Sequence, residues 1–131
     1  MSNANFNIQL DKFLEGIPDK VQEVQKKLAF EVLTRVVDKS PVDTGRFKAN
    51  WNTAIGVPDL DTSEDTDKMG YEAKQEALRV LANLDPYETV YITNNLDYAV
   101  ALENGRSDQA PSGMVAVTVA EIQVFLREVI R

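Results

Sequence analysis

Carboxylates are the side chains in this sequence that could most readily do chemistry. Asp97 and Glu103 lie in the stretch NNLDYAVALENG, residues 94–105, and a pair of carboxylates can act as acid and base in hydrolysis. On a short helix this spacing puts the two groups on different faces, so they do not converge. We therefore expect Asp97 to cap the helix and Glu103 to lie exposed on the surface.

A second group of acids suggests a calcium site. The segment 58–68, PDLDTSEDTDK, carries oxygen ligands with the alternate spacing of an EF-hand loop. However, Glu64 stands where that loop requires glycine, and Gly70 stands where a glutamate must close the site. We interpret the segment as a mobile, solvated acidic loop. The alternating positions are Asp59, Asp61, Ser63 and Asp65.

Two residue types are absent from the sequence, which reduces the number of possible reactions further. The chain has no Cys and no His, which removes disulfides, thiolate nucleophiles, and the commonest general base and metal ligand. No glycine-rich phosphate loop or nucleophile motif is present. We expect no enzyme activity, no metal and no cofactor.

Aromatic side chains could stack on nucleic-acid bases. The candidates are Trp51, Tyr91 and Tyr98, but only Arg46 and Lys48 lie near them in sequence, and the formal net charge is −7. A protein that neutralises phosphates should instead be basic or carry a basic stripe. The aromatic residues are therefore expected in the core.

Length and composition favour one globular domain over residues 1–131. The chain is 44% hydrophobic and 27% charged, which is ordinary for such a domain. No apolar run approaches the roughly 20 residues that span a membrane, and the N-terminus does not resemble a signal peptide. We expect residues 1–17 to form an N-terminal arm or a short helix.

Helical spacing dominates the first third of the chain. An apolar stripe runs from residue 10 to residue 38 and is interrupted at Gly16-Ile17-Pro18. Because proline is tolerated only in a first helical turn, we predict a short helix over 9–15 and a long helix over 18–38, ended by Ser40-Pro41. The stripe comprises Leu10, Leu14, Ile17, Val21, Val24, Leu28, Val32 and Val36.

Two strands are predicted in the middle of the chain. Phe47, Ala49, Trp51 and Thr53 alternate with polar residues from Arg46 onward, which is typical of a strand with its aromatic side chains inward. A second strand is expected in ETVYITNN, residues 88–95, and should pair with the first. Its Val90 and Ile92 face opposite to Thr89, Tyr91 and Thr93. Helical spacing over 69–84 predicts a helix between the two strands.

Helices also complete the predicted fold. Asn95 or Asp97 is expected to cap a short helix that ends at Asn104-Gly105. The last stretch, 113–131, fits a strand or a helix by periodicity, and its length favours a helix with Ser112 as N-cap. We predict an α+β fold: a small antiparallel sheet packed against a long N-terminal helix and a C-terminal helix, with short helices in the connections.

Two motifs carry a resemblance to a known family. SPVDTGRFKANW (40–51) and ITNNLDYAVALENGRSDQAPSGMVAVTVAEI (92–122) resemble the neck and tail-completion proteins of long-tailed bacteriophages, which include minor tail protein Z-like components. The resemblance covers roughly residues 20–125. The candidate interface and motif residues are Asp43, Thr44, Gly45, Arg46, Trp51, Asn95, Tyr98, Glu103, Gly105, Arg106, Gln109 and Pro111.

The resemblance implies a virion structural protein rather than an enzyme. Such a protein is expected to form a homo-oligomeric ring, usually six-fold, at the head-proximal end of the tail tube, where it joins the tail to head-connector proteins. Genomic DNA passes through the ring without specific binding, and the acidic balance suits a channel that repels phosphates. The expected locations are the virion tail and neck, and the host cytoplasm during assembly.

Two other classes of function remain open. An acidic standalone protein-binding module that masks a host partner's nucleic-acid site would explain the charge, but not the motifs. A small hydrolase based on carboxylates is a more distant alternative, since no acid pair converges.

Overall fold

The long apolar stripe forms the central helix of the molecule. The computed structural model describes residues 8–9 and 21–129, and helix α1 spans Val21–Lys39. Its predicted inward side chains are buried, with Leu28 and Val36 fully inaccessible to solvent. The helix ends just before Ser40-Pro41, as predicted. The short helix expected over 9–15 lies outside the described residues, except that Gln9 belongs to strand β1, Ile8–Gln9.

The sheet is small and antiparallel, as the sequence predicts. Strands β2, Trp51–Ile55, and β3, Val90–Asn94, pair with Thr53 opposite Ile92. Strand β1 pairs with the other edge of β3, so the strand order is β1-β3-β2. The side chains of Val90 and Ile92 are fully buried, which confirms the inward face assigned to this strand.

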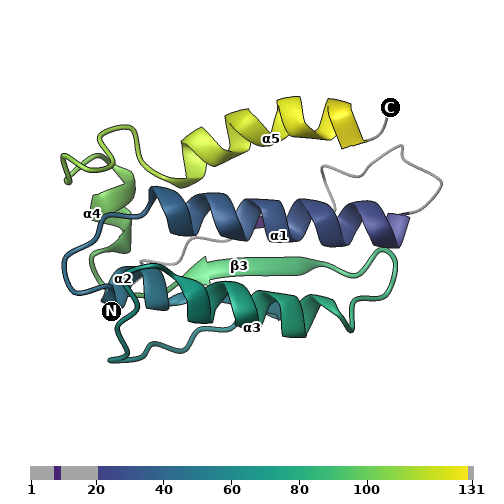
Figure 1. Cartoon of the computed structure of the whole chain (residues 1–131), viewed down its shortest axis with the longest axis horizontal. Coiled ribbons are helices and arrows are strands. Elements are labelled where there is room, and N and C mark those ends of the chain that lie inside the picture. Colours follow the sequence, from purple (N-terminus) through teal and green to yellow (C-terminus); the bar gives the residue numbers. More distant parts are fainter. Residues whose placement is uncertain (1–7, 10–20, 130–131) are drawn as a thin grey trace.

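Two further helices complete the layers. Helix α3, Tyr71–Leu81, packs against both α1 and β2, and helix α5, Val115–Val129, packs along α1. Figure 1 shows α1 in the middle, with α5 on one side of it and β3 on the other. The α+β fold class and both predicted helices are confirmed. Their apolar side chains join α1 and the sheet in one hydrophobic core, with Ile122 of α5 fully buried.

One predicted strand begins later than expected. Residues Arg46–Ala49 form a single helical turn, α2, and the strand starts only at Trp51. Gly45 has a left-handed backbone with a φ of 92°, and its carbonyl oxygen accepts a hydrogen bond from the Ala49 amide at 3.1 Å, which closes the turn. Phe47 and Trp51 are nevertheless buried as predicted, Phe47 on the helical turn and Trp51 at the first position of β2.

Candidate interaction surface

The first motif begins in the core rather than at the surface. Trp51 is 2% exposed, and its indole Nε1 donates to the hydroxyl of Ser40 at 2.8 Å, while that hydroxyl donates to the carbonyl of Val36 at 2.6 Å. The ring of Phe47 lies edge-on to Trp51, with 5.9 Å between ring centroids. Trp51, predicted as an interface or motif residue, therefore joins the end of α1 to the start of β2.

The glycine of the same motif supports the acidic loop. The Gly45 carbonyl accepts a hydrogen bond from the Asp67 amide at 3.0 Å. A Cβ at Gly45 would lie 2.5 Å from the Lys68 nitrogen, so no larger residue fits without a shift of the backbone. Gly45 thus lets the end of the acidic loop pass directly over the turn that begins α2.

Polar side chains of the motif also hold the middle of the acidic loop. The amide of Asn50 forms two hydrogen bonds with the backbone of Ser63: Nδ2 donates to its carbonyl at 3.0 Å, and Oδ1 accepts from its amide at 2.8 Å. Arg46 Nε donates to the same Ser63 carbonyl at 2.9 Å. The guanidinium of Arg46 also forms an ion pair with Glu64 at 3.3 Å. These contacts attach the middle of the loop to α2 and to the residue that follows it.

The start of the loop is held by the sheet. The carbonyl of Asp59 accepts hydrogen bonds from the Thr93 hydroxyl at 2.7 Å and from Asn95 Nδ2 at 2.9 Å. Asn52 Nδ2 donates to the Asp61 carbonyl at 3.0 Å. Thr93 is fully buried even though it lies on the predicted outward face of β3, because the loop covers it.

The predicted caps of the short helix are wrong. Helix α4 spans Ala99–Glu103, its N-cap position is Tyr98, and no side chain makes a capping hydrogen bond there. Asn95 Nδ2 instead donates a hydrogen bond to the Asp59 carbonyl of the acidic loop. Asp97 is exposed and makes no side-chain hydrogen bond within the described part of the chain.

Glu103 is a cap rather than an exposed surface acid. Its carboxylate accepts hydrogen bonds from the amides of Met114 and Val115, both at 2.8 Å, and of Ala116 at 2.9 Å. The first amides of a helix lack partners within the helix and attract negative charge. Glu103 therefore caps α5 in place of the predicted Ser112, and it joins α4 to α5.

The turn between α4 and α5 is tied to the first motif. Gly105 has a φ of 89°, which confirms the predicted left-handed exit, and a Cβ there would lie 2.6 Å from the Pro111 carbonyl oxygen. The side chain of Gln109 makes paired hydrogen bonds to the backbone of Val42: Oε1 accepts at 2.9 Å and Nε2 donates at 3.1 Å. Residues 41–44 and 105–111 thus lie side by side.

Together these contacts form one surface from two distant motifs. The ring of Tyr98 lies 5.9 Å from that of Phe47, and Arg46, Asn95 and Tyr98 line a hollow of about 200 Å³ with Thr62 of the acidic loop. We call the exposed part of this region the motif surface. Its predicted residues are Asp43, Thr44, Tyr98, Arg106, Gln109 and Pro111.

Sequence reasoning missed the residues that hold the acidic loop. Asn50, Asn52 and Thr93 occupy outward positions of the predicted strands, yet their side chains donate hydrogen bonds to loop carbonyls. The excess of amide side chains beside a segment without regular structure is the signal that could have revealed them. A strand face covered by irregular backbone needs side chains that satisfy its carbonyls.

Three side chains in the described residues have shifted pKa values. Hydrogen bonds from Lys39 and Arg35 lower the pKa of the Glu121 carboxyl on α5, and the hydrogen bond to Glu121 raises the pKa of Arg35. Burial lowers the pKa of Lys48, which is 8% exposed. The Glu121 contacts join α5 to α1.

Neither a cluster of metal ligands nor a membrane-spanning helix is found in the described part of the chain. Residues 8–9 and 21–129 contain no group of three or more acidic, His or Cys side chains that could hold a metal ion. None of the helices in this part of the chain has the length and apolar character needed to cross a bilayer.

Comparison with known proteins assigns the class of this protein. The chain matches the model of a family described as "Bacteriophage HK97-gp10, putative tail-component" over residues 4–105. The match spans most of the chain, and this protein belongs to that family. It is a phage tail component, as the two motifs indicated. No curated protein and no solved structure matches the chain.

Proposed function

We propose that this tail component completes the tail at its head-proximal end, where it forms a six-membered ring and joins the tail to the head without catalysing a reaction. The observation that carries this proposal is the arrangement of the motif residues in the structure. They fold into a continuous surface, tied together by the contacts of Gln109 with Val42 and of Glu103 with the start of α5. We propose that an adjacent subunit of the ring binds the motif surface.

A closed ring sets a geometric requirement for each subunit. Head-to-tail assembly joins two different surfaces of the same chain, and it closes when the rotation between neighbours allows. The motif surface supplies one of them. Its exposed aromatic ring, Tyr98, and its exposed cation, Arg106, belong to residue types that are enriched at protein interfaces.

The charge of the chain is compatible with passage of the genome. A net charge of −7 opposes adhesion of DNA phosphates to a ring that surrounds them. The partners in this proposal are the tail tube on one side and a connector protein of the head on the other.

The proposal is tested by removing the gene from the phage and imaging the particles by electron microscopy. We expect overlong or defective tubes, or tails that do not join heads, and we expect purified protein to restore joining. Normal virions without the protein would refute it. Light scattering of the protein with and without purified tail tubes then separates a ring-former from a standalone module that masks a host partner.

A further inference from the structure

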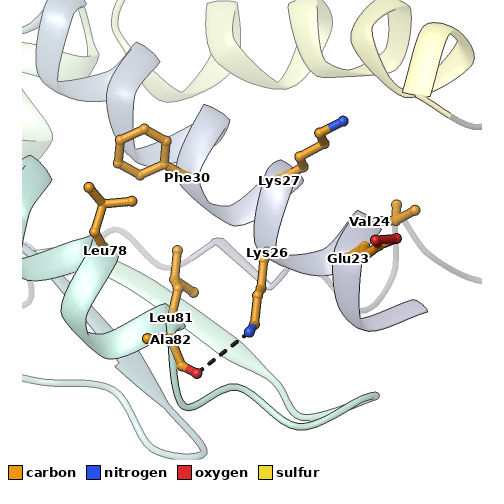
Figure 2. Close-up of a pocket in the computed structure, with 8 residues that line it drawn as sticks. All are labelled: Glu23, Val24, Lys26, Lys27, Phe30, Leu78, Leu81 and Ala82. Carbon is orange, nitrogen blue, oxygen red and sulfur yellow. Dashed lines mark hydrogen bonds between the residues drawn. The ribbon is translucent and has the colours of Figure 1, made fainter. Parts of the chain in front are cut away.

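A groove between α1 and α3 has an apolar floor and a basic rim. Its volume is about 620 Å³. Figure 2 shows Phe30 of α1 facing Leu78 of α3, with Leu81 beside them. Lys26 and Lys27 line the α1 side, and Lys26 Nζ lies 3.5 Å from the Ala82 carbonyl. Glu23 is the single acid among the lining residues, so the groove is locally positive on an acidic protein.

The first half of the acidic loop has the complementary character. Leu60 is 58% exposed and stands between Asp59 and Asp61. Val57, directly before the loop, is 72% exposed. An exposed leucine flanked by carboxylates is an apolar projection with a negative rim. Within the described residues, the side chain of Asp61 makes no hydrogen bond or ion pair, so it is free to meet a cation.

The hydrogen bonds around the loop prepare it for binding. The carbonyls of Asp59 and Asp61, on both sides of Leu60, are held by Thr93, Asn95 and Asn52. A segment already fixed in one conformation loses less conformational entropy when it binds. Leu60 itself stays exposed and is available for contact.

We infer that the groove between α1 and α3 receives residues 57–61 of a second copy of this chain, with Leu60 against Phe30 and Leu78 and with Asp61 near Lys27. The loop connects β2 to α3 along one edge of the molecule, and the groove lies on another face, between α1 and α3 (Figures 1 and 2). The contact joins two different surfaces of the chain, so successive copies can associate head-to-tail, as a ring requires. This inference rests on the proposed ring and identifies its second surface.

Continuity with the motif surface supports the same arrangement. Thr62, one residue beyond Asp61, lines the hollow that contains Arg46 and Tyr98. A neighbour that covers Leu60 therefore also reaches the motif surface. One side of the interface is formed by the loop and motif surface, and the other by the groove.

Cross-linking tests the contact directly, because the chain has no natural cysteine. We propose two single variants, Leu60→Cys and Leu78→Cys, both at exposed positions. Mixed in full-length protein and oxidised, they should form a disulfide-linked pair, since a disulfide needs Cβ atoms about 4 Å apart. The matched control replaces Leu78→Cys with Val124→Cys, which is 57% exposed on α5. Equal yields with both partners, or linkage mainly between two Leu60→Cys chains, would overturn the inference.

A charge exchange tests the same contact in assembly. Asp61→Lys and Lys27→Glu should each reduce ring formation at least tenfold, and the double variant should recover it. A mixture of the two single variants should also assemble, because alternating subunits pair opposite charges at every interface. Glu128→Lys and Arg127→Glu, both exposed on α5, are the matched controls and should assemble normally. Native mass spectrometry distinguishes a ring from a dimer, and a dimer alone would contradict head-to-tail contact.

The two proposals fail in different ways. Purified variants are added to tails that lack the protein, and joining to heads is counted. If the unmodified protein restores joining and Asp61→Lys restores it equally, the groove contact is wrong while the proposed function stands. If even the unmodified protein has no effect and virions form without it, the proposed function itself is wrong.

Discussion

At the scale of single residues, the carboxylate of Glu103 shows how one side chain joins two elements. It completes the backbone hydrogen bonding of three amides at the start of α5 while it belongs to the last turn of α4. Pattern analysis places Glu103 on a helix but cannot reveal this role, because the partner amides lie eleven or more residues ahead and meet it only after the turn folds.

Replacement of Glu103 should therefore destabilise the protein. We expect Glu103→Ala to lower the free energy of unfolding by about 1–2 kcal/mol, the usual cost of losing a helix cap. Asp97→Ala is the matched control, because this acid caps nothing in the structure, and it should change stability by less than about 0.5 kcal/mol. Urea denaturation of both variants measures the difference, and equal losses would contradict the assignment.

Gly105 offers a second test at the residue scale. Gly105→Ala combines a left-handed backbone with a clash, since the added Cβ would lie 2.6 Å from the Pro111 carbonyl oxygen. Gly56→Ala is the control: its φ of 87° is similar, but no atom lies within 4 Å of an added Cβ. We expect Gly56→Ala to cost about 1 kcal/mol from backbone strain. Gly105→Ala should lower the free energy of unfolding clearly more than Gly56→Ala does, as measured by thermal unfolding. Similar losses for the two variants would show that the turn relaxes around the added Cβ.

At the scale of elements, three charged side chains join α5 to α1. Glu121 accepts hydrogen bonds from Arg35 and Lys39, each at 2.7 Å, and these lower its pKa. A carboxyl with a lowered pKa in the folded state adds stability above its unfolded pKa, and this stability is lost as pH falls through the folded pKa.

The expected pH effect is small because the side chains are partly exposed. Glu121 retains 37% and Arg35 29% of their side-chain accessibility, so the contribution at neutral pH should stay below about 1 kcal/mol. Glu121→Gln should be less stable than the unmodified protein at neutral pH, and the difference should vanish in acid. Chemical denaturation across the acid range, at low and high salt, checks this expectation. A difference that persists in acid would point to packing instead.

The acidic loop provides a prediction about an irregular element. Its mobility remains a prediction from composition, and the hydrogen bonds of Asn50 to Ser63 act against it. We expect Asn50→Ala to increase cleavage after Glu64 by a glutamate-specific protease at least threefold, because the loop backbone loses two partners. Asn83→Ala is the control, since its side chain makes one long hydrogen bond of 3.4 Å on the surface. Unchanged cleavage would show that the remaining contacts suffice.

Elements were predicted well where burial follows a simple period. A single type of element fits each of three patterns: the stripe of α1, the spacing over 71–81, and the alternation of Val90 and Ile92. The strand predicted from residue 46 is wrong at its start, because Phe47 can be buried from a helical turn as well as from a strand. Caps were predicted from local residue types, whereas the cap of α5 and the loop contacts form between residues that are distant in the sequence.

At the scale of the whole molecule, the fold class and the phage tail family were accessible from the sequence, but the location of the working surface was not. The motif residues divide into buried supports, such as Trp51, and exposed side chains, such as Tyr98 and Arg106. The groove between α1 and α3 had no sequence signal, because its floor residues have the same helical spacing as core residues.

The position of α5 on the far side of α1 has a consequence for synthesis. Every other described element precedes α5 in the chain, so α1 and the sheet can fold while α5 is still being translated. Until then, the face of α1 that receives Ile122 is open to water and to other nascent chains. We expect ribosome-bound chains that stop before residue 115 to recruit chaperones that recognise apolar surface, and to release them once α5 has emerged and packed.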